Sequence, residues 1–270
     1  MTFGSLTFCT LLFISYAAPG NFSPPPRLIE GRIVGGNEVS IVRHPHQISL
    51  RRRTCTECAY LHDCGGSILN EDTILTAAHC VVNRRVSNLM VIAGTNNRAG
   101  SDGTVALVSK VVTHELYNAS ITDYDVALLL LTTPLKFDHL FIAPVALVAA
   151  APTAGAKAKV TGWGTVSEGG VLASRLQVVN VFVQDQEQCI GAYGARITDA
   201  MLCAGVVEGG KDACQKDSGG PLLVEDQLAG ITSWAIGCAR PEYPGVYVNV
   251  SHVREWIVSN VAANSMCKLK

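Results

Sequence analysis

The sequence has 270 residues, of which 48% are hydrophobic, 16% are charged and 25 are glycines. A chain of this length and composition is expected to fold as one large domain or two small ones. The formal net charge of −1 provides no basic field for nucleic acid, and no apolar run beyond the N-terminus is long enough to span a bilayer.

The chain begins with an apolar run, Leu6–Ala18. This run is too short for a membrane anchor, and the small residues Ser15 and Ala17 suit cleavage after Ala17. We therefore predict residues 1–17 as a signal peptide and the protein as secreted and extracellular. Residues 18–32 follow, with the run Pro24-Pro25-Pro26 that favours an extended, exposed segment, so that Arg32 at its end is an accessible cleavage site.

From Ile33 onward, short apolar runs are broken by Gly, Pro, Asn and Asp. Their lengths suit β-strands, and their spacing is typical of barrels or sandwiches. The runs are Gln47–Leu50, Thr73–Ala77, Leu89–Ala93, Val105–Val112, Val126–Leu131, Lys159–Gly162, Val178–Val183, Pro221–Val224, Ala229–Trp234 and Gly245–Val250. One helix is predicted, at the C-terminus, where Val253, Trp256, Ile257 and Val261 recur at helical spacing after Ser251 as the expected N-cap.

The chain has ten cysteines, and one of them, Cys9, lies in the predicted signal peptide. In a secreted chain the other nine indicate disulfides rather than metal thiolates. Their odd number leaves one thiol free or paired with another chain. Cys55 and Cys58 could form a local bridge, since the partners that a zinc or redox site needs are not visible.

Three polar residues lie beside the strand-like runs. His79 follows Thr73–Ala77, Asp125 precedes Val126–Leu131, and Ser218 lies in a glycine-rich turn before Pro221–Val224. A serine hydroxyl becomes a good nucleophile only with a nearby base and with donors for the developing oxyanion. Taken singly, these residues are equally compatible with a structural histidine, a turn aspartate and a loop serine.

Together with Ile33-Val34-Gly35-Gly36, Gly162-Trp163-Gly164 and Ser233-Trp234, these motifs resemble the chymotrypsin-like serine proteases of the trypsin-like branch. The resemblance implies an all-β fold of two packed Greek-key antiparallel β-barrels with a C-terminal α-helix. The protease domain would span 33–270, with one barrel at about 33–144 and the other, with the helix, at about 145–266. Neither cofactor nor metal is implied.

The resemblance implies that Ser218 is the nucleophile, that His79 is its base and that Asp125 orients the imidazole. The amides of Lys216 and Ser218 are implied as the oxyanion hole. An esterase of the α/β-hydrolase type would need Gly-x-Ser-x-Gly and the order Ser, Asp, His, whereas the order here is His, Asp, Ser. A protease homologue that binds partners without cutting is a second alternative, and only Lys216 favours it.

Asp212 is implied at the floor of a substrate pocket, where a carboxylate in a low-dielectric slot selects a long cation. Proteins or peptides cut after Arg or Lys are therefore the expected substrates. The other implied pocket residues are Ala213, Ser233, Trp234, Ala235 and Gly245. Ala235 stands where relatives have glycine and should narrow the entrance, while Gly245 should keep one wall open.

The resemblance also implies an inactive precursor that another protease activates by cutting after Arg32, which makes residues 18–32 an activation propeptide. The new ammonium of Ile33 is expected to pair with Asp217 and to order the loop around it. Before the cut, His62 occupies the position where relatives place a partner for Asp217.

Lys216 departs from the family, which nearly always has glycine at this position. Its amide remains a donor, but a residue with a Cβ restricts the backbone. Its side chain is expected to project bulk and positive charge toward the leaving group. Slower turnover on some substrates and weak binding of rigid protein inhibitors should follow.

The resemblance implies three disulfides, Cys64–Cys80, Cys189–Cys203 and Cys214–Cys238, and it leaves Cys55, Cys58 and Cys267 unassigned. Asn118-Ala119-Ser120 predicts an exposed glycosylation site. The loop Thr95–Asp102 has one carboxylate, fewer than calcium prefers, so the calcium site of many trypsins is expected to be missing.

Arg51, Arg52 and Arg53 begin an expected insertion in a surface hairpin, Arg51–Ala59. Such a charge run is most often a solvated loop. The sharper hypothesis is an exosite for an acidic partner or inhibitor, stiffened by a bridge between Cys55 and Cys58. The protein is expected to be a monomer.

Overall fold

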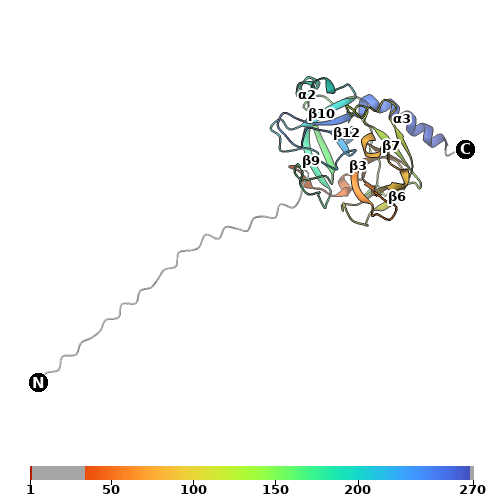
Figure 1. The fold of residues 1–270 in the computed structure, drawn as a ribbon, viewed down its shortest axis with the longest axis horizontal. Helices are drawn as coiled ribbons and strands as arrows, with labels where there is room; N and C mark the ends of the chain where they lie inside the picture. The colour runs from red at the N-terminus through yellow and green to blue at the C-terminus, as the bar shows by residue number, and fades with distance from the viewer. Residues whose placement is uncertain (2–33, 268–270) are drawn as a thin grey trace. The chain divides into compact units, whose positions relative to one another are not determined.

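Two antiparallel β-barrels, each closed by six strands, form the body of the protein (Figure 1). The computed structural model describes Met1 and residues 34–267, with side chains as far as residue 264. The predicted signal peptide, Arg32 and Ile33 therefore lie outside the described residues. The predicted all-β fold with a C-terminal helix is confirmed.

The N-terminal barrel has the strand order β2-β3-β4-β7-β6-β5. Its strands are β2 (Gln47–Arg52), β3 (Leu61–Asn70), β4 (Thr73–Thr76), β5 (Leu89–Ala93), β6 (Thr104–Thr113) and β7 (Ala127–Leu131). Every residue of β4 and β7 is buried. Strands β4 and β7 pair, with Thr76 opposite Ala127. The end of β4, just before His79, and the start of β7, just after Asp125, therefore lie side by side at one end of the barrel.

The C-terminal barrel follows the order β9-β10-β13-β12-β11-β8, and pairing of β8 with β9 closes it. Its strands are β8 (Lys157–Gly162), β9 (Gln177–Val183), β10 (Met201–Gly205), β11 (Pro221–Val224), β12 (Gln227–Trp234) and β13 (Gly245–Asn249). The short strand β1 (Asn37–Glu38) pairs with the start of β9. Alternate residues of β9 are buried, as expected for a strand with one face in the core.

All ten predicted runs correspond to strands, but the short strand β1 and the strands β3 and β10 were not among them. In β3 the polar His62 and Asp63 and the pair Gly65-Gly66 obscure the apolar alternation. Gly65 is needed there, because an ideal Cβ would lie 2.9 Å from the Gly220 Cα. Strand β3 therefore passes directly beside the loop that carries Ser218.

The C-terminal helix α3 spans Val250–Cys267. It begins one residue before Ser251, so the predicted N-cap is wrong, and the Ser251 hydroxyl instead donates to Asn249 Oδ1 at 2.7 Å. Two further helices were not predicted from the sequence, α1 (Ala78–Val81) and α2 (Gln186–Tyr193). The Asp185 side chain caps α2 by accepting from the Glu187 amide. Three single turns of 3-10 helix are η1 (Ile41–Arg43), η2 (Val86–Asn88) and η3 (Gly194–Arg196).

Among the residues that the structure describes, no helix has the length and apolar character needed to cross a membrane.

Four disulfides join cysteines of the described part of the chain. The three implied pairs, Cys64–Cys80, Cys189–Cys203 and Cys214–Cys238, are confirmed. The structure adds Cys55–Cys58 as a local bridge between residues whose Cα atoms are 5.1 Å apart. The side chain of Cys267 lies outside the described residues.

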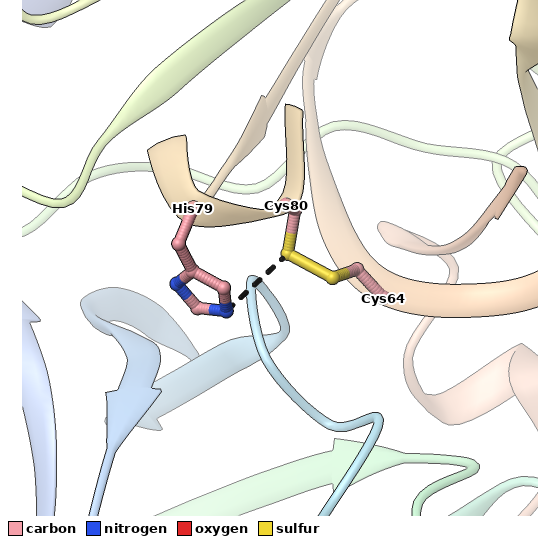
Figure 2. A group of neighbouring side chains, drawn as sticks. All are labelled: Cys64, His79 and Cys80. Carbon is pink, nitrogen blue, oxygen red and sulfur yellow. Dashed lines mark hydrogen bonds between the residues drawn. A yellow bond between two sulfur atoms is a disulfide. The ribbon is translucent and has the colours of Figure 1, made fainter. Parts of the chain in front are cut away.

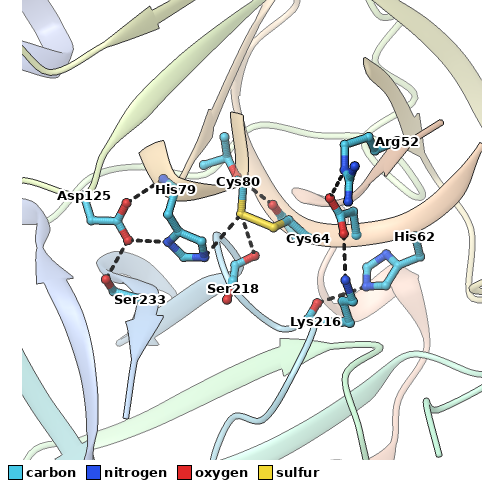
Figure 3. The surroundings of a disulfide bond; sticks show 12 residues. Arg52, His62, Cys64, His79, Cys80, Asp125, Lys216, Ser218 and Ser233 are labelled. Atoms are coloured by element: carbon cyan, nitrogen blue, oxygen red, sulfur yellow. Dashed lines mark hydrogen bonds and ion pairs between the residues drawn. A yellow bond between two sulfur atoms is a disulfide. The ribbon is translucent and has the colours of Figure 1, made fainter. Parts of the chain in front are cut away.

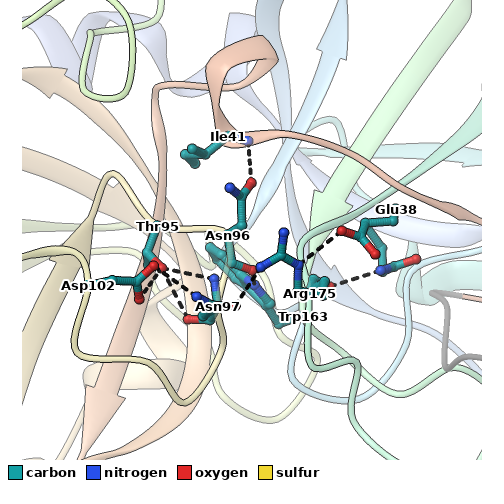
Figure 4. A network of polar contacts seen from close by, with 9 residues as sticks. Glu38, Ile41, Thr95, Asn96, Asn97, Asp102, Trp163 and Arg175 are labelled. Atoms are coloured by element: carbon teal, nitrogen blue, oxygen red, sulfur yellow. Dashed lines mark hydrogen bonds and ion pairs between the residues drawn. The ribbon is translucent and has the colours of Figure 1, made fainter.

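Polar side chains join the loop after β5 to the second barrel (Figure 4). The Trp163 indole donates to the Asn96 carbonyl at 2.8 Å. Arg175 donates to Asn97 Oδ1 at 2.8 Å and to Glu38 Oε1 at 2.9 Å. These contacts connect residues far apart in the sequence, so they help to hold the two barrels in one arrangement.

The loop Thr95–Asp102 is closed by its own side chains (Figure 4). The carboxylate oxygens of Asp102 accept from the Thr95 hydroxyl at 2.9 Å and from the side-chain amide of Asn97 at 2.8 Å. The loop's one carboxylate is therefore satisfied by donors of the same loop.

Candidate active site

His79, Asp125 and Ser218, which are far apart in the sequence, meet where the two barrels face each other (Figure 3). His79 lies in α1, directly after β4. Asp125 lies two residues before β7, which pairs with β4. Ser218 lies in the loop before β11, a strand of the other barrel. The predicted constellation is thus assembled by three separate strand ends.

The carboxylate of Asp125 is completely buried and holds His79 at two points. Its Oδ1 accepts from the His79 amide at 2.8 Å, and its Oδ2 accepts from His79 Nδ1 at 2.6 Å. The Ser233 hydroxyl also donates to Oδ2, at 2.6 Å. Three donors thus satisfy the buried charge, as a buried carboxylate requires.

This hydrogen bonding places the proton of neutral His79 on Nδ1 and leaves Nε2 free to act as a base. Burial alone would lower the pKa of His79, but the hydrogen bond to Asp125 and its charge outweigh burial and raise that pKa. The imidazole is therefore prepared to accept a proton and to be stabilised once it is charged.

Ser218 lies between His79 and Lys216 in Figure 3. The Sγ of Cys80 lies 3.7 Å from His79 Nε2 and 3.8 Å from the Ser218 carbonyl. Because a disulfide sulfur has no hydrogen, we regard these as packing contacts, which place serine and imidazole against the same bridge. The Ser218 carbonyl also accepts from the Gly65 amide at 2.8 Å.

Figure 2 shows Cys64, His79 and Cys80, whose potential ligand atoms lie within 4.8 Å of one another. Metal binding by cysteine requires a thiolate. Here both sulfurs are joined in a disulfide, and His79 is oriented by Asp125. This cluster is therefore a brace beside the imidazole and does not have the chemistry of a metal site.

A pocket of about 210 Å³ opens beside Ser218. All six residues predicted to form the substrate pocket line it, namely Asp212, Ala213, Ser233, Trp234, Ala235 and Gly245. The resemblance also implied that the Cys214–Cys238 disulfide braces this pocket, and both cysteines line it. Sequence reasoning did not name the rest of its wall, Gln215, Thr232, Gly237, Val246 and Tyr247. Their position next to the predicted motifs is the only signal that could have identified them.

Asp212 lies in this pocket with 1% of its surface exposed. Its Oδ2 accepts from the Ala239 amide at 3.1 Å, whereas its Oδ1 is buried without a hydrogen-bond partner among the described residues. Burial raises the pKa of Asp212 to about 7. An ideal Cβ on Gly245 would lie 2.7 Å from the Oδ1 atom, so glycine at this position keeps the carboxylate accessible.

Asp217 is completely buried beside the Gly162-Trp163-Gly164 motif. Its carboxylate accepts from the Gly164 amide at 2.7 Å and from the Cys214 amide at 3.0 Å. Ideal Cβ atoms on Gly162 and Gly164 would lie 2.1 and 2.2 Å from its oxygens, so a larger residue at either position would clash with the carboxylate. Burial raises the pKa of Asp217 to about 7.

The first described residues after Ile33 contact the same loop. The Val34 carbonyl accepts from the Asp212 amide at 3.3 Å. Gly35 has φ +67°, and an ideal Cβ there would lie 2.3 Å from the Gly210 carbonyl oxygen. The segment that begins the protease domain therefore packs against residues 210–212.

His62 contacts Lys216 in this structure and not Asp217. Its Nε2 lies 3.0 Å from the Lys216 carbonyl, and its Nδ1 lies 2.8 Å from the Ser49 hydroxyl. Since a carbonyl only accepts, neutral His62 carries its proton on Nε2 and accepts from Ser49 at Nδ1. Burial lowers the pKa of His62 to about 4. Its pairing with Asp217 stays a prediction about the uncleaved precursor.

Lys216 has φ +76°, a left-handed conformation that glycine adopts most easily. The sequence predicted that its side chain would project toward the leaving group. In the structure its ammonium lies 2.7 Å from Asp63 Oδ1, and Arg52 binds the other oxygen of Asp63 at 2.5 Å. Asp63 is thus a residue of this site that sequence reasoning missed.

The expected insertion Arg51–Ala59 begins too early, because Arg51 and Arg52 are the last two residues of β2 and only Arg53 lies in the loop to β3. The protein itself engages each of the three guanidinium groups. The partners are, in chain order, the carbonyls of Arg98 and Gly100 for Arg51, the carboxylate of Asp63 for Arg52, and the carbonyls of Thr56 and Ser87 for Arg53. The Arg53 guanidinium also stacks on Tyr60. Binding of an acidic partner stays a prediction, and in this structure the three guanidinium groups are engaged within the protein.

Asn118 lies on an exposed turn, where its Oδ1 accepts from the Ser120 amide at 3.0 Å. This position is compatible with the predicted glycosylation, which the structure does not test.

Comparison with known proteins agrees with this geometry. The family model described as Trypsin matches residues 33–257. Trypsin eta of Drosophila erecta is 49% identical over 234 residues, which cover 86% of this chain and 91% of that protein. Trypsin zeta of Drosophila melanogaster is 46% identical over 238 residues, which cover 84% of this chain and 85% of that protein. Trypsin-1 of Astacus astacus is 44% identical over 239 residues, which cover 84% of this chain and 99% of that protein.

Proposed function

The chain belongs to the trypsin family of serine endopeptidases, and on that premise we propose a secreted precursor that is activated by cleavage after Arg32. The activated enzyme hydrolyses peptide bonds that follow Arg or Lys in proteins and peptides. Its partners are these substrates, an activating protease and protein inhibitors. Asn118 is the proposed glycosylation site of the secreted form.

In the proposed reaction, Ser218 Oγ attacks the scissile carbonyl carbon while His79 Nε2 takes the hydroxyl proton. Asp125 holds the imidazole in the tautomer that can accept this proton and stabilises the imidazolium. The amides of Lys216 and Ser218 donate to the oxyanion. The C–N bond then breaks, His79 protonates the leaving amine, and water releases the acyl group by the same steps in reverse.

The observation that carries the proposed specificity is the buried Oδ1 of Asp212, which has no partner in the described part of the chain and lines the pocket beside Ser218. A buried carboxylate without a countercharge is costly. A guanidinium or ammonium that enters the pocket would supply both the charge and the missing hydrogen bond. Neutral side chains would supply no charge, so we expect hydrolysis after Arg and Lys.

Two observations support activation by a new N-terminus. Asp217 is fully buried, and within residues 34–267 its carboxylate accepts from the backbone amides of Gly164 and Cys214. Val34, which follows Ile33, is bonded to the loop that carries Asp217. An ammonium on Ile33 would therefore need only a short path to this carboxylate, and the pair would offset the cost of burying each charge.

The test uses the full-length precursor before and after cleavage at Arg32, with a library of short peptide amides. We expect hydrolysis after Arg and Lys only in the cleaved protein. Asp212→Ser should remove this preference and leave slow hydrolysis, and Arg32→Gln should leave an inactive precursor. Unchanged Arg selectivity in Asp212→Ser would overturn the specificity, and full activity in Arg32→Gln would overturn the activation step.

A further inference from the structure

We propose that Asp63 is a positioning residue that holds Lys216, and with it one amide of the oxyanion hole, in the conformation that catalysis requires. The inference rests on the proposed function, because it concerns the donor that Lys216 supplies to the reacting carbonyl. It assigns a role in turnover to a side chain on β3 that touches neither the substrate nor the nucleophile.

The need for such a residue follows from the backbone of Lys216. A left-handed conformation is unfavourable for residues with a Cβ and nearly free for glycine. Lys216 has φ +76° although it carries a long side chain. Something in the surrounding structure must therefore stabilise this conformation, since the residue itself opposes it.

The side chain of Lys216 is held by an ion pair that is partly sheltered from water. Its Nζ lies 2.7 Å from Asp63 Oδ1, and only 17% of the Asp63 side chain is exposed. Arg52 Nε binds the other carboxylate oxygen at 2.5 Å. Burial alone would raise the pKa of Asp63, but hydrogen bonds and charges of both cations hold that pKa below its usual range. Asp63 is therefore charged and oriented at neutral pH.

The carbonyl group of Lys216 is held by His62, which directly precedes Asp63 on β3 (Figure 3). His62 Nε2 donates to the Lys216 carbonyl at 3.0 Å, and the Ser49 hydroxyl donates to His62 Nδ1 at 2.8 Å. Adjacent residues of β3 thus bind the two ends of one residue in the catalytic loop. Each is supported in turn by a residue of β2, His62 by Ser49 and Asp63 by Arg52.

This double attachment restricts the direction of the Lys216 amide. The hydrogen bond and the ion pair hold the carbonyl and the side-chain end of Lys216 against β3. The peptide group before its Cα is held as well, because the Gln215 carbonyl accepts from the Thr165 amide at 2.9 Å. Since φ relates these held groups, the ion pair opposes a change of φ. Losing the ion pair would leave only the carbonyl attached, and the residue could relax toward negative φ, which turns its N–H away from the oxyanion.

The alternative is that Asp63 and Lys216 form an ordinary surface ion pair, which contributes little to a protein. The two interpretations differ in one respect. If Asp63 acts by holding Lys216 in the left-handed conformation, Asp63→Ala must lower kcat when residue 216 is lysine and must leave kcat unchanged when it is glycine. An ordinary surface ion pair affects stability and not turnover, so Asp63→Ala would then leave kcat unchanged in both backgrounds.

The test is a double-mutant cycle in the activated enzyme, with Asp63→Ala, Lys216→Gly and the combination, measured as kcat and KM on an Arg peptide amide. We expect Asp63→Ala alone to lower kcat about tenfold, which corresponds to the cost of a left-handed residue. KM should change by less than about twofold, because the substrate pocket is untouched. In the Lys216→Gly background, Asp63→Ala should change kcat by less than about twofold.

Lys159→Ala is the matched control, because it removes an exposed ion pair with Asp226, which lies in the turn between β11 and β12. It should leave kcat unchanged. An equal loss from Asp63→Ala in both backgrounds would overturn the inference, since Asp63 would then act through the fold in general. No loss in either background would overturn it as well. Activity of the unaltered enzyme on the Arg amide tests the proposed function separately, so the two failures are distinguishable.

Discussion

Thr76 Oγ1 occupies the space that any side chain at Gly219 would need, at 2.2 Å from the ideal Cβ position. The Thr76 hydroxyl is fixed there because it donates to the Gly65 carbonyl at 2.9 Å. Gly219 also has φ +79° and donates to the Thr232 carbonyl at 2.7 Å. The glycine after Ser218 is therefore required by contact between the two barrels as well as by the turn.

We predict that Gly219→Ala lowers kcat/KM on an Arg peptide amide by about a hundredfold or more, because the clash displaces the neighbouring Ser218. The measurement is steady-state kinetics of the activated variant. Gly155→Ala is the matched control. Gly155 has φ +80° and nothing within 4 Å of its ideal Cβ, so this variant tests backbone strain alone and should keep full activity. Equal losses in both variants would contradict the steric explanation.

The pKa of Asp212 predicts pH-dependent binding of cations in the pocket. Burial raises this pKa to about 7 in the free site, and a bound cation must lower it, because opposite charges favour the ionised form. Affinity for benzamidine should therefore rise as pH increases through 7 and level off above it. Below 7 it should fall by about tenfold per pH unit, with release of a proton on binding.

Calorimetry on the activated Ser218→Ala variant between about pH 5.5 and about pH 8.5, in two buffers of different ionisation enthalpy, measures both quantities. Asp212→Asn is the control, and it should bind weakly and without this pH dependence. Affinity that stays constant across the range would show that Asp212 is already ionised in the empty pocket.

His46 predicts a loss of stability in acid. Burial, and secondarily the charge of His44, lowers the pKa of His46 from 6.5 to about 3. The folded state therefore binds fewer protons at this residue than the unfolded state between these two values. Its contribution to stability is complete above pH 6.5 and is lost as pH falls toward 3, by about 1.4 kcal/mol per unit.

Replacing His46 by a residue that does not titrate should remove its part of the pH dependence of stability. In a Ser218→Ala background, which prevents self-digestion, His46→Leu should lose less stability on acidification than its parent. Urea unfolding at several pH values measures the difference, and the same background cancels the opposite contributions of Asp212 and Asp217. Parallel curves for His46→Leu and its parent would contradict the prediction.

Lys216 predicts weak binding of rigid protein inhibitors. An inhibitor that covers the catalytic loop must desolvate the ion pair between Lys216 and Asp63, which costs free energy. Lys216→Gly should therefore raise inhibitor affinity by about tenfold or more, or about 1.4 kcal/mol. Inhibition kinetics with a tight-binding trypsin inhibitor provide the measurement. Lys159→Ala should leave the inhibition constant unchanged, and an unchanged constant for Lys216→Gly would refute the prediction.

Most of the candidate site could be predicted because its chemistry is carried by short motifs. His79, Asp125 and Ser218 each stand beside an apolar run, and their neighbours Gly219 and Cys80 belong to the same motifs. The carboxylates Asp212 and Asp217 were assigned through the same loop. Asp63 could not be found in this way, because its partner Lys216 lies 153 residues away and becomes a neighbour only when the barrels pack.

The sequence by itself determined the family, ten of the strands and the residues of the catalytic constellation, since these depend on local patterns and on residue order, and the resemblance to the family implied three disulfides. Tertiary structure alone decided the internal contacts of the three arginines and the attachment of Lys216 to His62 and Asp63. It also decided that Asp212 is buried with a free oxygen. The physical reason is that burial and long-range pairing depend on how two closed barrels meet, and no segment contains that information alone.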